Sequence, residues 1–166
     1  MLIIGVDPGL TGAISLLCHE RGLLQCMDLP VVANGLATGK MLRWIDADAL
    51  QSLLSDWSKR FEFATESVHA CIERPIPMPS MPSTTTASSF DSFGVIRALL
   101  YGKVAPGGLA MVNPREWKKF FGLSTDKDAS RRVALSLYAN APVARAKDHN
   151  RAESILIGHF AMRGMA

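Results

Sequence analysis

Short apolar runs separated by turn residues dominate the first part of the chain. Two such runs, at residues 2–6 and 13–17, flank a turn rich in glycine and proline, and a third run covers 23–29. Gly22 precedes this third run and Pro30 ends it. Apolar runs of this length between turn residues predict β-strands, so we expect three short strands joined by tight antiparallel turns.

Helical spacing follows further along the chain and alternates with two more short apolar runs. Asp46 stands before leucines at helical spacing and is typical of a helix N-cap. Residues 68–72 and 109–112 predict a fourth and a fifth strand. Further helices are expected over residues 86–101 and 114–121, from 126 or 128, and from about 148. Residues 31–44 carry no strong pattern, and the order as a whole predicts an α/β protein with helices packed on a mixed sheet.

Composition narrows the class of protein. The chain has 166 residues, of which 48% are hydrophobic, so we expect one domain over residues 1–166 with a real core rather than a disordered chain. No apolar run approaches the roughly 20 residues that span a bilayer, and no basic flank precedes the first apolar run. The three cysteines form no CxxC pair, which favours reduced thiols over a disulfide framework or a zinc site. We therefore expect a cytoplasmic protein without membrane association.

Charge is distributed unevenly along the chain. Residues 1–96 carry 6 Lys or Arg against 10 Asp or Glu, and residues 97–166 carry 12 against 5. A basic half is typical of a protein that binds a polyanion, and ordinary surface variation explains the same count about equally well.

Two carboxylates end predicted strands. Asp7 follows the first apolar run, and Glu73 follows residues 68–72. If these two strands are neighbours, both side chains emerge at one edge of the sheet, where partly buried carboxylates repel one another and need a cation. Clustered oxygen ligands suit a hard divalent cation such as Mg²⁺.

A third acidic cluster lies where the last helix is expected to begin. Asp148 and Glu153 would be about 140° apart around a helix, so they converge only if Asp148 precedes the first turn. His149 and Asn150 are better placed to share a helix face with Glu153. The competing interpretation of Asp148 is a plain N-cap.

Five motifs together resemble the RuvC-type Holliday junction resolvases, especially their compact phage and prophage forms. They are GVDPGLTGAIS at 5–15, IERP at 72–75, VNPREWKKFFGL at 112–123, DKDASRRVALSLY at 126–138 and KDHNRAESILIG at 147–158. The resemblance implies a ribonuclease H-like fold, with a five-stranded mixed sheet and helices on both faces. It also implies a homodimer that resolves four-way or related branched DNA junctions by paired nicks, with Mg²⁺ as cofactor and Mn²⁺ able to substitute.

By position, the resemblance assigns catalysis and metal binding to Asp7, Glu73, Asp148 and Glu153. The last two acids usually lie three residues apart in bacterial members, and some members use a histidine for the first of them. His149 and Asn150 therefore remain rivals of Asp148. Ile76 stands where bacterial members often carry an aromatic residue that acts at the junction centre. Whether Phe90, Phe93 or Phe121 replaces it is open, and core packing is the better explanation of Phe90 and Phe93.

Basic residues in the second half of the chain are expected to contact DNA phosphates. They are Lys118, Lys119, Arg131, Arg132, Lys147 and Arg151. Each one alone is better explained as a surface charge. Lys147 is also the cation nearest in sequence to the last acidic pair, where it would offset charge developing at the scissile phosphate.

Three alternative functions share some of these features. An actin-like phosphotransferase also opens with a strand, an aspartate and a glycine turn. It needs two such domains, for which the chain is too short, so we expect no nucleotide cofactor. A branched-DNA-binding protein without catalysis would lack acidic ligands that this chain retains. A ribonuclease H acting on RNA–DNA hybrids is opposed only by the resemblance.

The helix expected at residues 86–101 is the predicted dimer contact. Phe90, Phe93, Ile96, Leu99 and Leu100 give it a wider apolar surface than one core face requires. The alternative is that this helix is buried between the sheet and the last helix.

Overall fold

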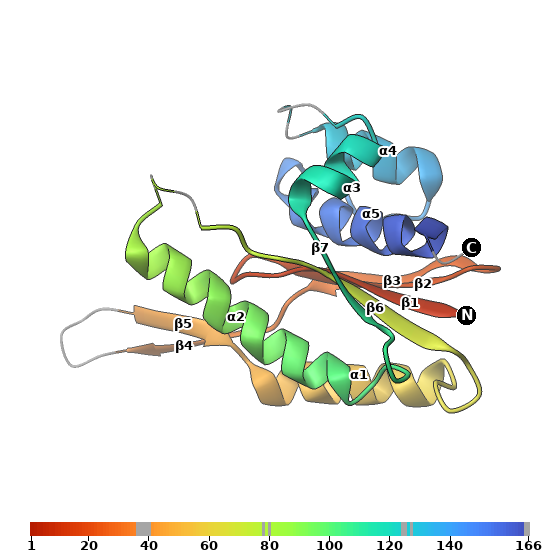
Figure 1. The fold of residues 1–166 in the computed structure, drawn as a ribbon, viewed down its shortest axis with the longest axis horizontal. Helices are drawn as coiled ribbons and strands as arrows, with labels where there is room; N and C mark the ends of the chain where they lie inside the picture. The colour runs from red at the N-terminus through yellow and green to blue at the C-terminus, as the bar shows by residue number, and fades with distance from the viewer. Residues whose placement is uncertain (36–40, 78, 80, 124–125, 127, 165–166) are drawn as a thin grey trace.

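The computed structural model describes residues 1–35, 41–77, 79, 81–123, 126 and 128–164. A five-stranded sheet in the order β3-β2-β1-β6-β7 forms its centre (Figure 1). Its strands are β1 (Leu2–Asp7), β2 (Ala13–Cys18), β3 (Gly22–Asp28), β6 (Val68–Glu73) and β7 (Leu109–Val112). Strand β1 pairs antiparallel with β2 and parallel with β6, so the predicted mixed sheet is confirmed.

Helices cover both faces of this sheet (Figure 1). One face carries α1 (Ala47–Arg60) and α2 (Ser83–Tyr101). The other carries α3 (Pro114–Phe120), α4 (Ala129–Leu137) and α5 (His149–Gly164), which a 3₁₀ turn over Ala146–Asp148 precedes. The predicted cap of α1 is present, because Asp46 Oδ1 accepts a hydrogen bond from the backbone N–H of Ala49 at 2.9 Å. Within the described residues no helix is long and apolar enough to cross a membrane.

Alternate side chains of the central strands point into two separate cores. The core beneath α1 and α2 takes Leu2, Ile4 and Val6 of β1. Ile3 belongs instead to the core beneath α5, and Cys71 of β6 belongs to that core too. Because strand residues two apart share a face, Asp7 and Glu73 both point to the side of the sheet that α5 covers.

Helix α5 lies directly on the backbone of β1. A Cβ atom at Gly5 would collide with the carbonyl oxygen of Ser154 and the amide nitrogen of Gly158. The hydroxyl of Ser15 donates a hydrogen bond to the same Ser154 carbonyl at 2.9 Å. These contacts hold α5, and the side chains at its start, close to the end of β1.

Two strands from the region without a strong sequence pattern, residues 31–44, pair as an antiparallel ribbon. Its strands are β4 (Val31–Gly35) and β5 (Met41–Ile45), and they were not predicted. Figure 1 shows the ribbon extending away from the main sheet, alongside the first turns of α2.

The apolar surface of α2 divides between the core and the outside. Phe93, Ile96 and Leu100 are buried. Part of the surface proposed for a dimer is therefore core. The stated alternative is also wrong, because α2 packs on the opposite face of the sheet from α5.

Candidate active site

Three carboxylates from separate elements converge at one edge of the sheet. Asp7 ends β1 and Glu73 ends β6, and these strands are paired in parallel with Val6 opposite Ile72. Glu153 comes from the start of α5, which covers the same face. Burial raises the pKa of Asp7 well above its usual value, and the charges of Glu153 and Glu73 raise this pKa further.

Helix α3 brings an indole to Glu73. Strand β7 runs parallel to β6 with Val112 opposite Glu73, so α3 begins at the same edge of the sheet as the acids. Trp117 is fully buried, and its Nε1–H donates a hydrogen bond of 2.6 Å to Oε2 of Glu73. Burial raises the pKa of Glu73, whereas this hydrogen bond lowers it.

The next residue, Lys118, supplies the cation of the cluster. Its Nζ lies 3.3 Å from Oε2 of Glu153 and 5.0 Å from the centroid of the Trp117 ring. The same positive charge lowers the pKa values of Asp7 and Glu73. Lys118 therefore partly neutralises all three acids, and it is a different residue from Lys147, which is the cation nearest to the last acidic pair in sequence.

Asp148 is not brought to this cluster. It is 4% exposed and is held by Arg145, whose Nη2 lies 2.7 Å from Oδ1 and whose backbone N–H donates to Oδ2 at 2.8 Å. These contacts lower the pKa of Asp148 to about 2. The charges that act on Asp148 are those of Arg145 and Arg151, so its contacts are those of a capping residue before α5.

The two rivals of Asp148 have different surroundings. The amide of Asn150 donates to the backbone carbonyl and the hydroxyl of Thr11, and so ties α5 to the turn that follows Asp7. His149 has only a long contact, 3.4 Å from Nδ1 to the carbonyl oxygen of Ala146. Among the described residues, no three His, Cys, Asp or Glu side chains already stand in an arrangement that would hold a metal ion.

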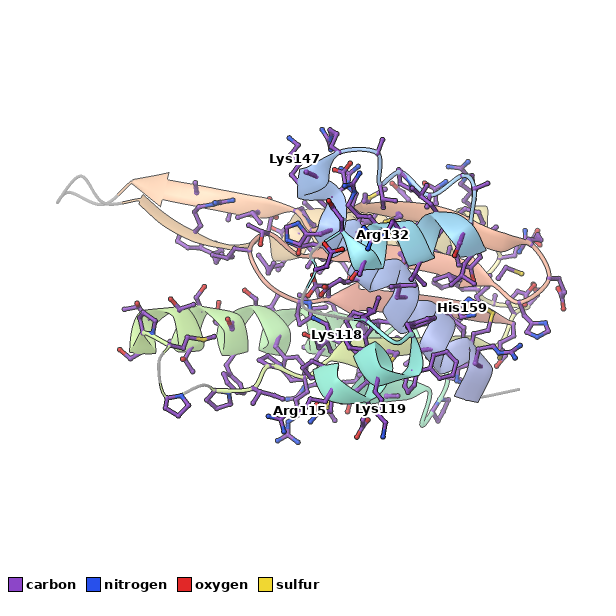
Figure 2. All side chains as sticks on the ribbon, turned by 90° about the horizontal axis from the view of Figure 1, so that it is seen from above. Arg115, Lys118, Lys119, Arg132, Lys147 and His159 are labelled. Carbon is purple, nitrogen blue, oxygen red and sulfur yellow. The ribbon has the colours of Figure 1, made fainter. Side chains whose placement is uncertain are left out.

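Some of the basic residues proposed for DNA contacts are held inside the protein, and the others lie at its surface. Arg131 bonds to Asp128 and to two backbone carbonyls, and Arg151 forms a two-point ion pair with Asp28, so both hold the fold together. Arg132 is exposed and paired with Asp126. Figure 2 shows Lys118 between two outer groups of cations, which are Arg115 and Lys119 on one side and Arg132 and Lys147 on the other.

Three adjoining pockets surround the turn after Asp7. Their volumes are about 440, 450 and 480 Å³. The first and second share Leu10 and Thr11, and the second and third share Pro8, so the pockets form one continuous groove. The third pocket contains Glu73 and Lys118 and is also lined by the exposed side chains Ile76 and Phe90.

Two residues of this region were missed by sequence reasoning. Trp117 looked like an ordinary core residue on an apolar helix face, and the sequence carries no sign that its N–H faces a carboxylate. Arg43 lies on the unpredicted ribbon and lines the first of the three pockets. The apolar residues on either side of Arg43, at 41–42 and 44–45, were the available signal for a strand there.

Comparison with known proteins supports the fold. No protein-family model and no curated protein sequence matches the chain. Among solved structures, RuvC of Thermus thermophilus in complex with a Holliday junction substrate superimposes with a TM-score of 0.59 at 12% identity, covering 100% of this chain and 98% of that one. A structure of Thermus thermophilus RuvC on its own gives 0.56 at 13% identity, covering 99% and 97%. The chain therefore has the ribonuclease H-like fold of RuvC, as its motifs predicted.

Proposed function

We propose that the protein is a metal-dependent endodeoxyribonuclease that cuts four-way or related branched DNA junctions. The observation that carries this proposal is the meeting of Asp7, Glu73 and Glu153 at the end of the sheet, where burial and then the charges of the other two acids raise the pKa of Asp7. The fold shared with RuvC, over nearly the full length of both chains, supports the choice of substrate.

The residues present fit Mg²⁺, with Mn²⁺ as a substitute. Carboxylate oxygens are the ligands that these cations prefer, and three partly buried carboxylates carry more negative charge than Lys118 alone offsets. Asp7, Glu73 and Glu153 would hold the metal, and Asp148 is left out of the proposed set because Arg145 already neutralises it. When bound, the metal activates a water molecule and stabilises the leaving oxygen of the cut phosphodiester.

The chain's own side chains position the DNA strand. The groove around residues 8–12 passes the acids, and its third pocket offers the ammonium of Lys118 beside Glu73. A lysine in this position stabilises negative charge that develops on the phosphate during the reaction. Ile76 and Phe90 give the same pocket an apolar wall, which suits the face of a nucleobase next to the cut.

A homodimer would supply the two nicks that resolution requires. The outer face of α2 is the proposed contact, because it presents the exposed residues Ala98 and Tyr101 four and seven positions after Gly94. Tyr101 is 60% exposed, and a Cβ atom added at Gly94 meets nothing within 4 Å. A second helix could approach closely along this stripe.

Cleavage of three labelled substrates tests the proposal. The protein should nick a four-way junction in Mg²⁺ or Mn²⁺ and not in EDTA. Linear duplex DNA and an RNA–DNA hybrid should be cut at least tenfold more slowly than the junction. Preferential cutting of the hybrid would make the protein a ribonuclease H, and binding of the junction without cutting in either metal would make it a junction-binding protein.

A further inference from the structure

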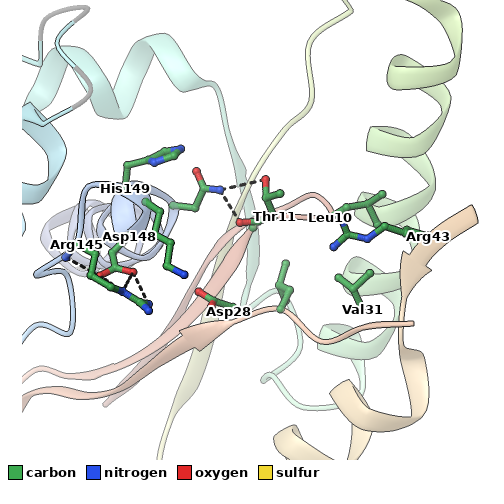
Figure 3. Close-up of a pocket in the computed structure, with 12 residues that line it drawn as sticks. Leu10, Thr11, Asp28, Val31, Arg43, Arg145, Asp148 and His149 are labelled. Atoms are coloured by element: carbon green, nitrogen blue, oxygen red, sulfur yellow. Dashed lines mark hydrogen bonds and ion pairs between the residues drawn. The ribbon is translucent and has the colours of Figure 1, made fainter. Parts of the chain in front are cut away.

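The pocket farthest along the groove from Glu73 is lined by cations from two distant parts of the sequence. This ribbon pocket has a volume of about 440 Å³ and is lined by residues 10–12, 28–29, 31, 43, 145 and 147–150. Figure 3 shows Arg43 approaching from the ribbon beside Leu10, while Arg145 and Asp148 lie on the opposite side. The pocket therefore opens between the β4–β5 ribbon and the start of α5.

Ion pairs within the protein account for only some of the charge in the ribbon pocket. Arg145 is neutralised by Asp148, and both carboxylate oxygens of Asp28 are taken by Arg151, at 2.6 and 2.7 Å. Within the described residues, Arg43 and Lys147 have no ion-pair partner. Both are exposed, so two positive charges face the pocket unpaired.

The orientation of Arg43 follows from the geometry of the ribbon. Neighbouring strand residues point to opposite faces, so Arg43 and Trp44 diverge. Trp44 lines a separate pocket with Val32 and Val95, whereas Arg43 lines the ribbon pocket. The ribbon thus presents its arginine to the groove and its tryptophan away from it.

The ribbon pocket is linked to the acids through two elements. Thr11, on its wall, follows Asp7 by four residues, which limits their separation to about 14 Å. Asn150 lines the same pocket, bonds to Thr11 and lies one helical turn before Glu153. A DNA strand whose phosphate lies at the acids would therefore place a neighbouring phosphate in the ribbon pocket.

We propose that the ribbon pocket is a phosphate subsite, in which Arg43 and Lys147 bind a backbone phosphate of the strand that is cut. This inference rests on the proposed nuclease function and extends DNA binding to Arg43, in the acidic half of the sequence. Two exposed cations without protein partners, across a cavity from one another, match a single phosphodiester anion. Arg43 would contact this neighbouring phosphate and take no part in the reaction itself.

The salt dependence of binding tests this subsite. Binding of a fluorescent four-way junction would be measured in EDTA between 50 and 300 mM NaCl for the wild type, Arg43→Ala, Lys147→Ala and the double variant. Each single change should flatten the log–log slope by about one, and the double change by about two. Arg43→Lys should keep the slope. Lys59→Ala, which removes an exposed cation from the end of α1 on the other face, should leave the slope unchanged.

Cleavage in Mg²⁺, measured on the same proteins, separates the subsite from the nuclease function. Lys59→Ala should cut the junction at the wild-type rate, whereas Arg43→Ala should cut more slowly at subsaturating protein, in proportion to its lost affinity. If the wild type binds with these slopes but never cuts, the subsite stands and the nuclease function falls. If the wild type cuts while the double variant keeps the wild-type slope, the subsite is refuted and the nuclease function stands. A large loss of saturated rate without a slope change would also refute it, because Arg43 would then act on the scissile phosphate.

Discussion

The indole N–H of Trp117 donates a hydrogen bond of 2.6 Å to the carboxylate of Glu73. This bond joins a fully buried side chain of α3 to the end of β6, so the core beneath α5 fixes the direction of one acid in the cluster. Because the donor is neutral, it orients Glu73 without cancelling the negative charge that a metal ion would need.

Trp117→Phe should displace the pH dependence of cleavage. The hydrogen bond lowers the pKa of Glu73, so its loss raises that pKa and should move the acidic limb of the pH–rate profile to higher pH. The lost bond should also cost about 1–3 kcal/mol of stability. Trp57→Phe, the same change in the core on the other face, should affect stability without moving the acidic limb. If the acidic limb of the pH–rate profile does not move in Trp117→Phe, then Trp117 does not lower the pKa of Glu73 in the active protein.

Asp7→Asn should raise thermal stability when no metal is present. The folded protein binds a proton at Asp7 more tightly than the unfolded chain, so the charged form destabilises the fold as pH rises above the usual value of 3.8. Melting temperatures in EDTA should be higher for Asp7→Asn than for wild type at pH 7. The increase should be about 2–4 °C for each kcal/mol by which removal of the charge raises the free energy of unfolding. The difference should shrink towards pH 3.5.

Asp148→Asn provides the matched control with the opposite sign. The folded pKa of Asp148 is about 2, so its charge stabilises the fold above the unfolded value of 3.8, and that contribution is lost as pH falls towards 2. The substitution should therefore lower the melting temperature at pH 7. Equal shifts of the same sign in Asp7→Asn and Asp148→Asn would contradict the different environments described for the two acids.

The same two positions should also separate in cleavage. Asp7→Asn, Glu73→Gln and Glu153→Gln should each abolish cutting of a four-way junction while junction binding in EDTA persists, because removing negative charge from the groove does not weaken attraction to phosphate. Asp148→Asn should retain cleavage within about tenfold, since Arg145 keeps this acid out of the cluster. If Asp148→Asn folds normally but loses all activity, then Asp148 is a metal ligand after all.

Neighbouring lysines on α3 should have different kinetic roles. Lys118 lies against Glu153, and Lys119 is exposed and projects from the outer edge of α3 (Figure 2). Lys118→Ala should lower the single-turnover cleavage rate at saturating protein by about 10²-fold or more. Lys119→Ala should instead flatten the salt slope of binding by about one and keep the saturated rate. If Lys119→Ala lowers the rate and Lys118→Ala only flattens the salt slope, then Lys119, and not Lys118, acts beside the acids.

Gly94→Glu tests the proposed homodimer without disturbing the core. A Cβ atom added at this position meets nothing within 4 Å, and replacing a mid-helix glycine favours the helix by about 0.5–1 kcal/mol. The wild type should sediment at twice the monomer mass at micromolar concentration, and Gly94→Glu as a folded monomer. Gln51→Glu, a similar charge on α1, should remain dimeric. A wild type that is monomeric both alone and on junction DNA would exclude paired nicking by a dimer.

Most of the fold could be predicted because its signals are local. Apolar runs between turn residues located the five strands, and Asp46 and Pro114 marked the starts of α1 and α3 correctly. The pairing of β1 with β6 then brought Asp7 and Glu73 together as expected. The β4–β5 ribbon was missed because its apolar residues stand next to one another, as in Val31–Val32 and Trp44–Ile45, and do not alternate with polar ones.

The other residues of the candidate site could not be placed from the sequence, because their positions depend on contacts between distant elements. The resemblance assigned Asp148 by its position, and Lys147 was named as the cation nearest to the acidic pair in sequence. In the structure a capping interaction holds Asp148 away, and Lys118 approaches from another helix. Likewise, Phe93 shares the helical spacing of a surface stripe on α2 but is 7% exposed. Side-chain direction across elements, rather than the identity of the elements, was the missing information.

The backbone contact between Gly5 and α5 sets how far Asp7 and Glu153 can move apart. The strand and helix backbones touch directly there, and the Ser15 hydroxyl bonds to the helix backbone, so the separation of Asp7 from Glu153 depends little on how neighbouring side chains pack. Exchanges among the surrounding Ile, Leu and Val residues would therefore change the melting temperature without changing the distance between Asp7 and Glu153. A single methyl group at Gly5, by contrast, would push the helix outward and carry Glu153 with it.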